Sequence, residues 1–500
     1  MTVTCFALGN DAAWDTLRSS IDPLNRIEAV EATLAHLRSV GALSVVIENE
    51  YLDQDFTAEF ARFYATVFKR YSKICRRLHF FSVDVSPILA LDPQALAERL
   101  NGANQTYLGF CVVRPLTHAP LGRTVLAGPV SPSDRSAKLL VRGDHVVHLL
   151  GATLSVTGFP FAQQDSRISS CAQATMWMAG RHFHVEHKGP WFSTVDVTEA
   201  ASQPTDTGLS MSLPAGSGGL DLNNMVRALR AMGREPFAYI APAIDKSVFP
   251  ATIDWTNTLR PREIINRYID SGIPVILGLL PWEQGQPVGH AVVAVGHTVK
   301  PLDVNTALPD RPTRAEFTEC FLVHDDQRGV TRQMPLVGGA GIGATPYSLQ
   351  NVAYIIVPLP KKVFINAEAA ETIAWQLLSS QLQTIWASLQ ANHAALVAPI
   401  VAEVNDFIDK VNRNLVIVWV TEFGLFNDLN HLDARNRRIV CHSVIDATSS
   451  NFWQAVSVFH APGFILRWLH DPQNPTGEFK SQGAVILNNS SYRPKIRGTL

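Results

Sequence analysis

A cysteine in the middle of the chain stands where a helix is expected to begin. Small and hydroxylated residues (SRISS) precede Cys171, and good helix formers (AQATMWMA) follow it. Unpaired N–H groups and the macrodipole at a helix N-terminus favour a thiolate over a thiol. The backbone N–H of Cys171 could also donate to a developing oxyanion. This segment therefore predicts a nucleophilic thiol.

A histidine and an aspartate downstream have the settings of a base and of a residue that orients it. His290 opens the segment HAVVAVGH, which follows the apolar run IPVILGLL and a short loop, so we expect it at the start of a strand. Asp325 ends the apolar segment FLVHD, before a turn. A carboxylate one strand away from a histidine can accept its second N–H and fix its tautomer. We prefer Asp325 to Asp326 because Asp325 ends the strand.

Together the segments CAQATMWMA, PVILGLL…GHAVVAVGH and FLVHDDQRG resemble the papain-like cysteine peptidase superfamily. The branch they resemble most includes the double-glycine leader peptidases of bacteriocin export and their stand-alone relatives. The resemblance implies an α+β fold, in which an N-terminal helix carries the cysteine and an antiparallel sheet carries the histidine and the aspartate. It also implies that a glutamine before the cysteine lends its amide to the oxyanion hole, and Gln164 and Gln163 are the matching candidates.

The chain departs from this family pattern at several positions around the three segments. Ala172 stands where the branch usually has glycine, and Asp326 stands where it usually has proline. The two glutamines precede Cys171 by more residues than usual, and Asp165 occupies the expected position. The residues TVKPLDVNTALPDRPTRAEF lengthen the stretch between the histidine and the aspartate, and we expect them to form an inserted loop or hairpin.

The chain is long enough for two or three domains. Strand and helix signals alternate in 1–135 and predict an α/β region, with helices at 24–39 and 56–78. Residues 136–360 are predicted to form the papain-like domain, led by a β-hairpin whose turn contains Arg142-Gly143-Asp144. Residues 361–500 are predicted to be helix-rich, because 365–412 has apolar residues at helical spacing. Those helices could mediate a homo-oligomer or simply pack on the body of the protein.

Composition excludes several functional classes. The formal net charge is −2, from 42 basic and 44 acidic residues, and no long basic block suggests a nucleic-acid partner. The apolar runs are too short to span a membrane. Six cysteines without a CxxC pair, and first residues that do not resemble a signal peptide, lead us to expect reduced thiols and a cytoplasmic location.

Two further motifs have simpler interpretations than a metal or cofactor site. His182, His184 and His187 lie in RHFHVEHK, whose spacing fits a partly solvated helix end better than a zinc site. The glycine-rich segment 337–344 lacks the Lys-Ser/Thr of a nucleotide loop, so we interpret it as a flexible loop bordering the cleft. We therefore expect no metal and no cofactor.

These observations predict a cysteine hydrolase with Cys171 as nucleophile, His290 as base, Asp325 as orienting acid and Gln164 as oxyanion donor. The expected partner is a protein or peptide substrate, cleaved at a peptide or isopeptide bond through a thioester. Two alternatives remain. Acyl transfer to an amine, as in transglutaminases, needs the same three residues, and a non-catalytic binding protein could have kept the fold.

Overall fold

The computed structural model divides into two compact units, Met1–Leu302 with Thr318–Pro358 and Asp303–Phe317 with Leu359–Leu500. No helix within the described ranges is long and apolar enough to cross a membrane. The structure describes residues 3–87, 91–129, 136–165, 171–202, 220–245, 252–255, 260–283, 286–300, 313–338, 344–376, 413, 417–424, 439–448, 455–461, 464–471 and 480–487.

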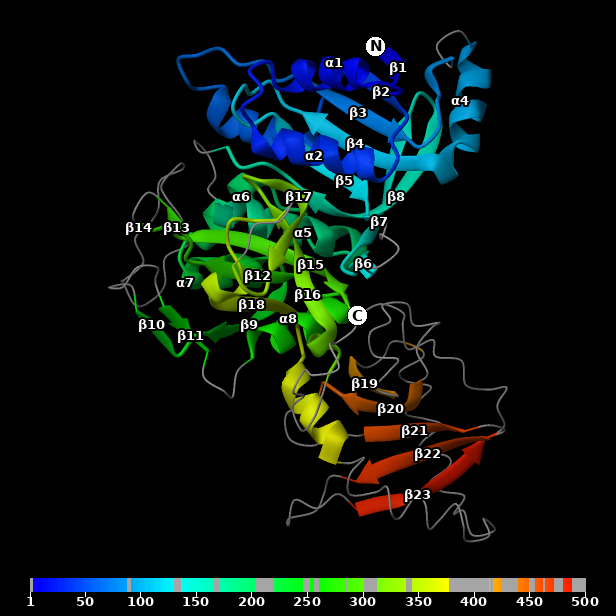
Figure 1. Cartoon of the computed structure of the whole chain (residues 1–500), viewed down its shortest axis with the longest axis vertical. Coiled ribbons are helices and arrows are strands. Elements are labelled where there is room, and N and C mark those ends of the chain that lie inside the picture. The colour runs from blue at the N-terminus through cyan, green and yellow to red at the C-terminus, as the bar shows by residue number, and fades with distance from the viewer. Residues whose placement is uncertain are drawn as a thin grey trace. The chain divides into compact units, whose positions relative to one another are not determined.

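The first unit contains an antiparallel sheet built mainly from the N-terminal residues (Figure 1). The large side chains packed on it include Phe56, Tyr64 and Phe81, each almost fully buried. In sheet order the strands are β1 (Val3–Ala7), β2 (Ser44–Tyr51), β3 (Cys75–Phe81), β4 (Tyr107–Val113), β5 (Leu121–Ala127), β8 (Ala152–Phe161) and β7 (Gly143–Leu149). Its helices are α1 (Asp11–Ile21), α2 (Glu28–Ser39), α3 (Gln54–Glu59) and α4 (Pro93–Gly102).

The predicted helix at 24–39 is confirmed in position by α2, but the helix predicted over 56–78 is wrong in length. Helical structure there consists of α3 and a π-helical turn, Phe60–Tyr64. Phe56, Phe60 and Tyr64 do share a helical face, and Phe56 has ring contacts with both of the others. Beyond them Val67 and Tyr71 still pack against the core, but Phe68 is fully exposed and β3 begins at Cys75. Apolar residues at helical spacing do not by themselves extend a helix.

A second sheet of the first unit contains the segments singled out by the sequence. In order its strands are β17 (Gly329–Pro335), β16 (Thr318–Asp325), β15 (His290–Val299), β12 (Val275–Leu279), β18 (Val352–Pro360) and β9 (Arg234–Ile240), with β6 (Ser136–Leu139) also paired to β15. The helices associated with it are α5 (Cys171–His187), α6 (Thr194–Ala201), α7 (Leu222–Ala231) and α8 (Pro261–Asp270). Two short pairs complete the unit, β10 (Ala243–Asp245) with β11 (Thr252–Asp254), and β13 (Trp282–Glu283) with β14 (Gln286–Pro287).

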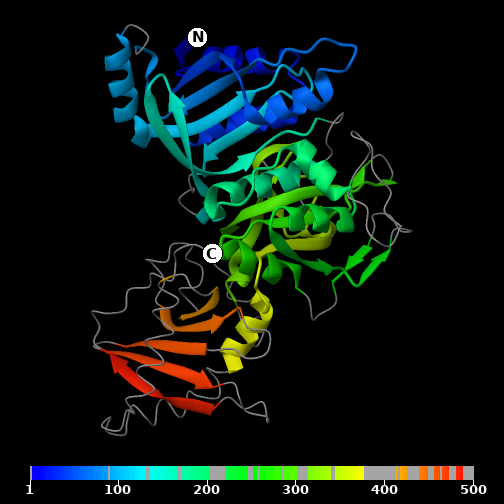
Figure 2. The same ribbon diagram turned by 180° about the vertical axis from the view of Figure 1, so that it is seen from behind.

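Helix α5 lies between the two sheets (Figures 1 and 2). It packs against β7 and β8 of the first sheet and against β15 and β16 of the second. Buried on so many sides, its residues are apolar or paired along most of its length. The described structure is therefore α+β with antiparallel sheets, as the sequence predicts at that level.

The Arg142-Gly143-Asp144 tripeptide does not close a hairpin, so that prediction is wrong. It connects β6, which pairs with β15, to β7, which pairs with β8 in the other sheet. The hairpin lies one strand further on, and its turn is Leu150-Gly151, where both residues have a positive φ. β-Branched residues on both sides of a Gly-Asp step indicated two strands correctly, but local sequence could not show that the strands join different sheets.

The second unit has a five-stranded antiparallel sheet in simple chain order. Its strands are β19 (Val418–Gly424), β20 (Ile439–Asp446), β21 (Ala455–Ala461), β22 (Phe464–Asp471) and β23 (Lys480–Leu487). Of the helices predicted at 365–412, the structure describes one at 367–376, whose Trp375 contacts Phe423. The rest of 365–412, on which the predicted self-association depends, lies outside the described residues.

Glycine at position 296 allows β6 to approach β15, and this yields a stability prediction. A Cβ at Gly296 would lie 2.2 Å from the carbonyl oxygen of Lys138. Replacing Gly296 with Ala should therefore lower the free energy of unfolding by about 2 kcal/mol, as overpacking does. The matched control is Gly289→Ala, immediately before the same strand, because a Cβ there meets nothing within 4 Å. Urea denaturation would measure both, and equal losses would contradict the prediction.

Candidate active site

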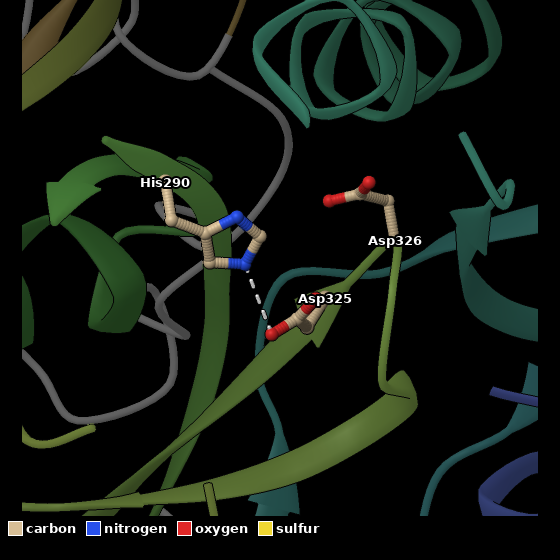
Figure 3. Close-up of side chains that lie close together, drawn as sticks. All are labelled: His290, Asp325 and Asp326. Carbon is tan, nitrogen blue, oxygen red and sulfur yellow. Dashed lines mark ion pairs between the residues drawn. The ribbon is translucent and has the colours of Figure 1, made fainter. Parts of the chain in front are cut away.

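Antiparallel pairing of β15 with β16 brings His290 and Asp325 together. His290 is the first residue of β15, and Asp325 is the last residue of β16. In an antiparallel pair the end of one strand lies beside the start of the other, and here Val293 is opposite His324. The Nε2 atom of His290 lies 3.1 Å from Oδ2 of Asp325 (Figure 3).

The carboxylate of Asp325 is completely buried and held by several donors. The hydroxyl of Tyr347 donates to Oδ2, and the backbone N–H groups of Gln327 and Arg328 donate to Oδ1 at 2.9 and 3.2 Å. Burial by itself would raise the pKa of Asp325. The hydrogen bonds from His290 and Tyr347, with the charge of His290, instead hold this pKa below its ordinary value. Asp325 is thus fixed in position as an anion.

His290 has the electrostatics of an imidazolium. Burial lowers its pKa, but hydrogen bonds with Asp325 and Cys171 and the charges of the neighbouring carboxyl groups raise it to about 11. Nε2 faces Asp325, which leaves Nδ1 as the nitrogen available to the thiol. A histidine between a cysteine and a buried carboxylate has the arrangement of a nucleophile, its base and the group that orients the base.

The helix α5 positions Cys171 at this histidine. Cys171 is the first residue of α5 and is half-buried. One turn later, the hydroxyl of the buried Thr175 donates to the carbonyl oxygen of Ala291 at 3.0 Å, which attaches the first turn of α5 to β15 beside His290. The helix α5 therefore brings Cys171 to the end of β15 that carries His290, and Cys171 is among the groups that raise the pKa of His290.

The oxyanion glutamine is the predicted residue with the least structural support. Gln164 is half-buried, and the residues between Asp165 and Cys171 lie outside the described ranges, so its role stays a prediction. Gln163 is buried away from solvent, where its Oε1 accepts from the backbone N–H of Leu121 at 3.3 Å. Asp165, in the position expected for the glutamine, lies 3.1 Å from Nε2 of His118.

Asp326, the neighbour of the orienting acid, is also completely buried. With His290 and Asp325 it forms the one group of His, Cys, Asp and Glu within the described ranges whose ligand atoms lie within 4.8 Å of one another, as shared metal binding would require. However, the oxygens of Asp325 already accept hydrogen bonds from Tyr347 and two backbone N–H groups. This bonding fits a carboxylate that orients His290 and leaves little room for a metal ion.

The histidines of α5 differ from one another in burial. His182 is almost completely buried, and burial lowers its pKa to about 3. His187 accepts a hydrogen bond at Nδ1 from Arg234 at 2.7 Å, and burial lowers its pKa to about 4. Both are therefore neutral. Only His182 belongs to the interior, whereas His184 and His187 are half-buried, as expected for a partly solvated helix end. Most of the predicted loop 337–344 lies outside the described residues.

The N-terminal region supports both halves of the site, which the sequence did not reveal. Asp55 of α3 accepts from Nε1 of Trp177 at 3.2 Å and pairs with Arg181, and both partners belong to α5. Glu28 of α2 pairs with Arg328 at 2.8 Å, in the turn that follows Asp325. The elements carrying the thiol and the orienting acid are therefore both anchored to helices that precede residue 60.

Tyr354, another residue that sequence reasoning missed, lies close enough to Cys171 for their charges to interact. It packs flat on Gly278, where a Cβ would lie 2.0 Å from its ring. The sequence could not show this position, because it depends on the pairing of β18 with β12, where Tyr354 is opposite Gly278.

Comparison with protein-family models, with curated proteins and with solved structures found no match for this chain.

The Asp325–His290 pair predicts the titration of the histidine. Asp325→Asn removes the carboxylate charge but keeps the shape of the side chain. The pKa of His290, about 11 in the intact site, should fall by roughly 2 or more. Burial still lowers this pKa, and the carboxylate that raised it is gone. The raised pKa also means that the imidazolium stabilises the fold fully below 6.5, and that this stabilisation is lost as the pH rises through about 11. NMR titration of the imidazole would measure the change.

A matched control lies on the same strand. Nε2 of His297 lies 2.9 Å from Oδ1 of Asp270, so Asp270→Asn removes a comparable partner from a second histidine of β15. This control should leave the titration of His290 unchanged. An unaltered pKa of His290 in Asp325→Asn, or an equal fall in Asp270→Asn, would show that Asp325 does not hold the imidazolium.

Proposed function

We propose that this chain is a cysteine hydrolase with a papain-like core, which cleaves a peptide or isopeptide bond. The observation that carries the proposal is the ion pair of His290 with the buried Asp325 at 3.1 Å, with Cys171 among the groups that raise the pKa of His290. A cysteine at a helix N-terminus, a histidine at a strand start and an acid on the neighbouring strand support the papain-like assignment. The sequence resemblance of the segments that carry these residues agrees with it.

In the proposed mechanism the proton of the pair resides on His290, since Asp325 stabilises the imidazolium. The thiolate of Cys171 attacks the carbonyl carbon, and the backbone N–H at the start of α5 donates to the oxyanion of the tetrahedral intermediate. The imidazolium then gives its proton to the leaving amine as the C–N bond breaks. Neutral His290 finally takes a proton from water, which attacks the thioester and frees the acid product and Cys171.

Tyr347 and Thr175 serve this mechanism as positioning residues. Tyr347 holds Oδ2 of Asp325, and Thr175 holds the first turn of α5 against β15. Catalytic geometry has to be maintained within a fraction of an ångström, so such supports matter as much as the reacting groups.

The thiol chemistry can be tested by labelling with iodoacetamide at neutral pH, followed by mass spectrometry of the peptides. Labelling should occur at Cys171 and be lost in Cys171→Ala, because His290 can take the proton of this thiol. The matched control is Cys5→Ala. Cys5 is half-buried like Cys171, but burial and the charge of Asp84 raise its pKa to about 12. Labelling that persists in Cys171→Ala, or that disappears in Cys5→Ala, would contradict the proposal.

A further inference from the structure

Asp326 is a buried carboxyl group without the partners that its neighbour has. Its side chain is 0% exposed, and neither of its oxygens accepts a hydrogen bond from another residue within the described structure. Leaving a buried carboxylate without partners is costly, whereas a neutral carboxyl group is much easier to bury. Figure 3 shows the carboxyl groups of Asp325 and Asp326 both facing His290, with an ion pair only from Asp325.

The surrounding charges also favour the neutral form of Asp326. The groups that interact with Asp326 are Asp325 on the same strand end, His290 on β15 and Tyr347, while Arg328 lies 3.8 Å from Asp325. Burial and the negative charge of Asp325 raise the pKa of Asp326 to about 8, and the positive charge of His290 opposes them only in part. At neutral pH, one carboxylate therefore accompanies one imidazolium.

We propose that Asp326 is a positioning residue for His290 that keeps its proton while the thiol centre works, and that its ionisation switches the centre off in alkaline solution. This inference rests on the proposed function. The proton leaves to solvent, and the carboxylate left behind puts a second negative charge beside the imidazolium. His290 then holds its own proton more tightly and gives it less readily to the leaving amine. The same charge repels the thiolate and the oxyanion.

The test measures the local charge through two alkylating agents of different charge. Iodoacetate and iodoacetamide react with the same thiolate, so the ratio of their rates at Cys171 reports the electrostatic potential there and cancels the protonation of the thiol. A Cys5→Ala background removes the other half-buried described thiol. In this protein the iodoacetate-to-iodoacetamide ratio should fall about tenfold as the pH rises through about 8, when Asp326 becomes charged.

Asp326→Asn carries a neutral group of the same shape, so its ratio should stay constant over this pH range. Asp326→Ser is a second neutral variant in case the amide disturbs folding. The dependence of the ratio on pH in the protein with Asp326 intact shows, without any substitution there, whether Asp326 keeps its proton at neutral pH. The control Asp22→Asn makes the same chemical change at a buried carboxyl group of the N-terminal region. In Asp22→Asn the iodoacetate-to-iodoacetamide ratio should still fall as the pH rises through about 8.

Each other outcome overturns the proposal. A constant ratio with Asp326 intact would mean that Asp326 does not ionise beside the thiol. An equal fall in Asp326→Asn or Asp326→Ser would assign the charge to another group. A ratio profile that changes on addition of EDTA would identify Asp326 as a metal ligand. Absence of any labelling at Cys171 would overturn the proposed function together with this inference.

Discussion

The ion pair between His290 and Asp325 is the interaction on which the rest of the site depends. Burial opposes the charge on both groups, and each stabilises the charge of the other across 3.1 Å. The pair in turn requires donors that keep Asp325 ionised, and the hydroxyl of Tyr347 and two backbone N–H groups supply them. A thiol placed beside this imidazolium, as Cys171 is, has a partner that can hold its proton.

The N-terminal region is part of the apparatus that maintains this geometry. Its helices reach the thiol-bearing helix through Asp55 and Arg181, and the acid-bearing turn through Glu28 and Arg328. The buried Asp55–Arg181 contact removes two charges from water, so separating its partners would leave both uncompensated. For this reason the boundary expected at residue 135 separates elements that work together, and β7 and β8, placed beyond it, complete the N-terminal sheet.

Asp325 and Asp326 are adjacent and have the same side chain, but the pKa is lowered in the first and raised in the second. Asp325, at the end of β16, faces His290 and gathers donors. Asp326 begins the turn, where no described donor from another residue reaches its oxygens, so burial and the charge of Asp325 raise its pKa. At neutral pH the two adjacent carboxyl groups therefore differ in charge, with Asp325 the anion and Asp326 the neutral acid.

The sequence by itself determined what depends on neighbouring residues. The residues around Cys171 encode a helix start, the apolar segments after His290 and before Asp325 encode strands, and both were predictable because periodicity and capping act over a few residues. Only the tertiary structure decided which strands pair, and therefore that the Gly143-Asp144 step joins two sheets. It also decided that helical structure ends at Tyr64. It alone also showed Thr175, Tyr347 and Asp55 supporting the site, and Asp326 without a partner. Hydrogen bonds, burial and pKa values arise between residues far apart in the chain, and a local pattern carries no record of them.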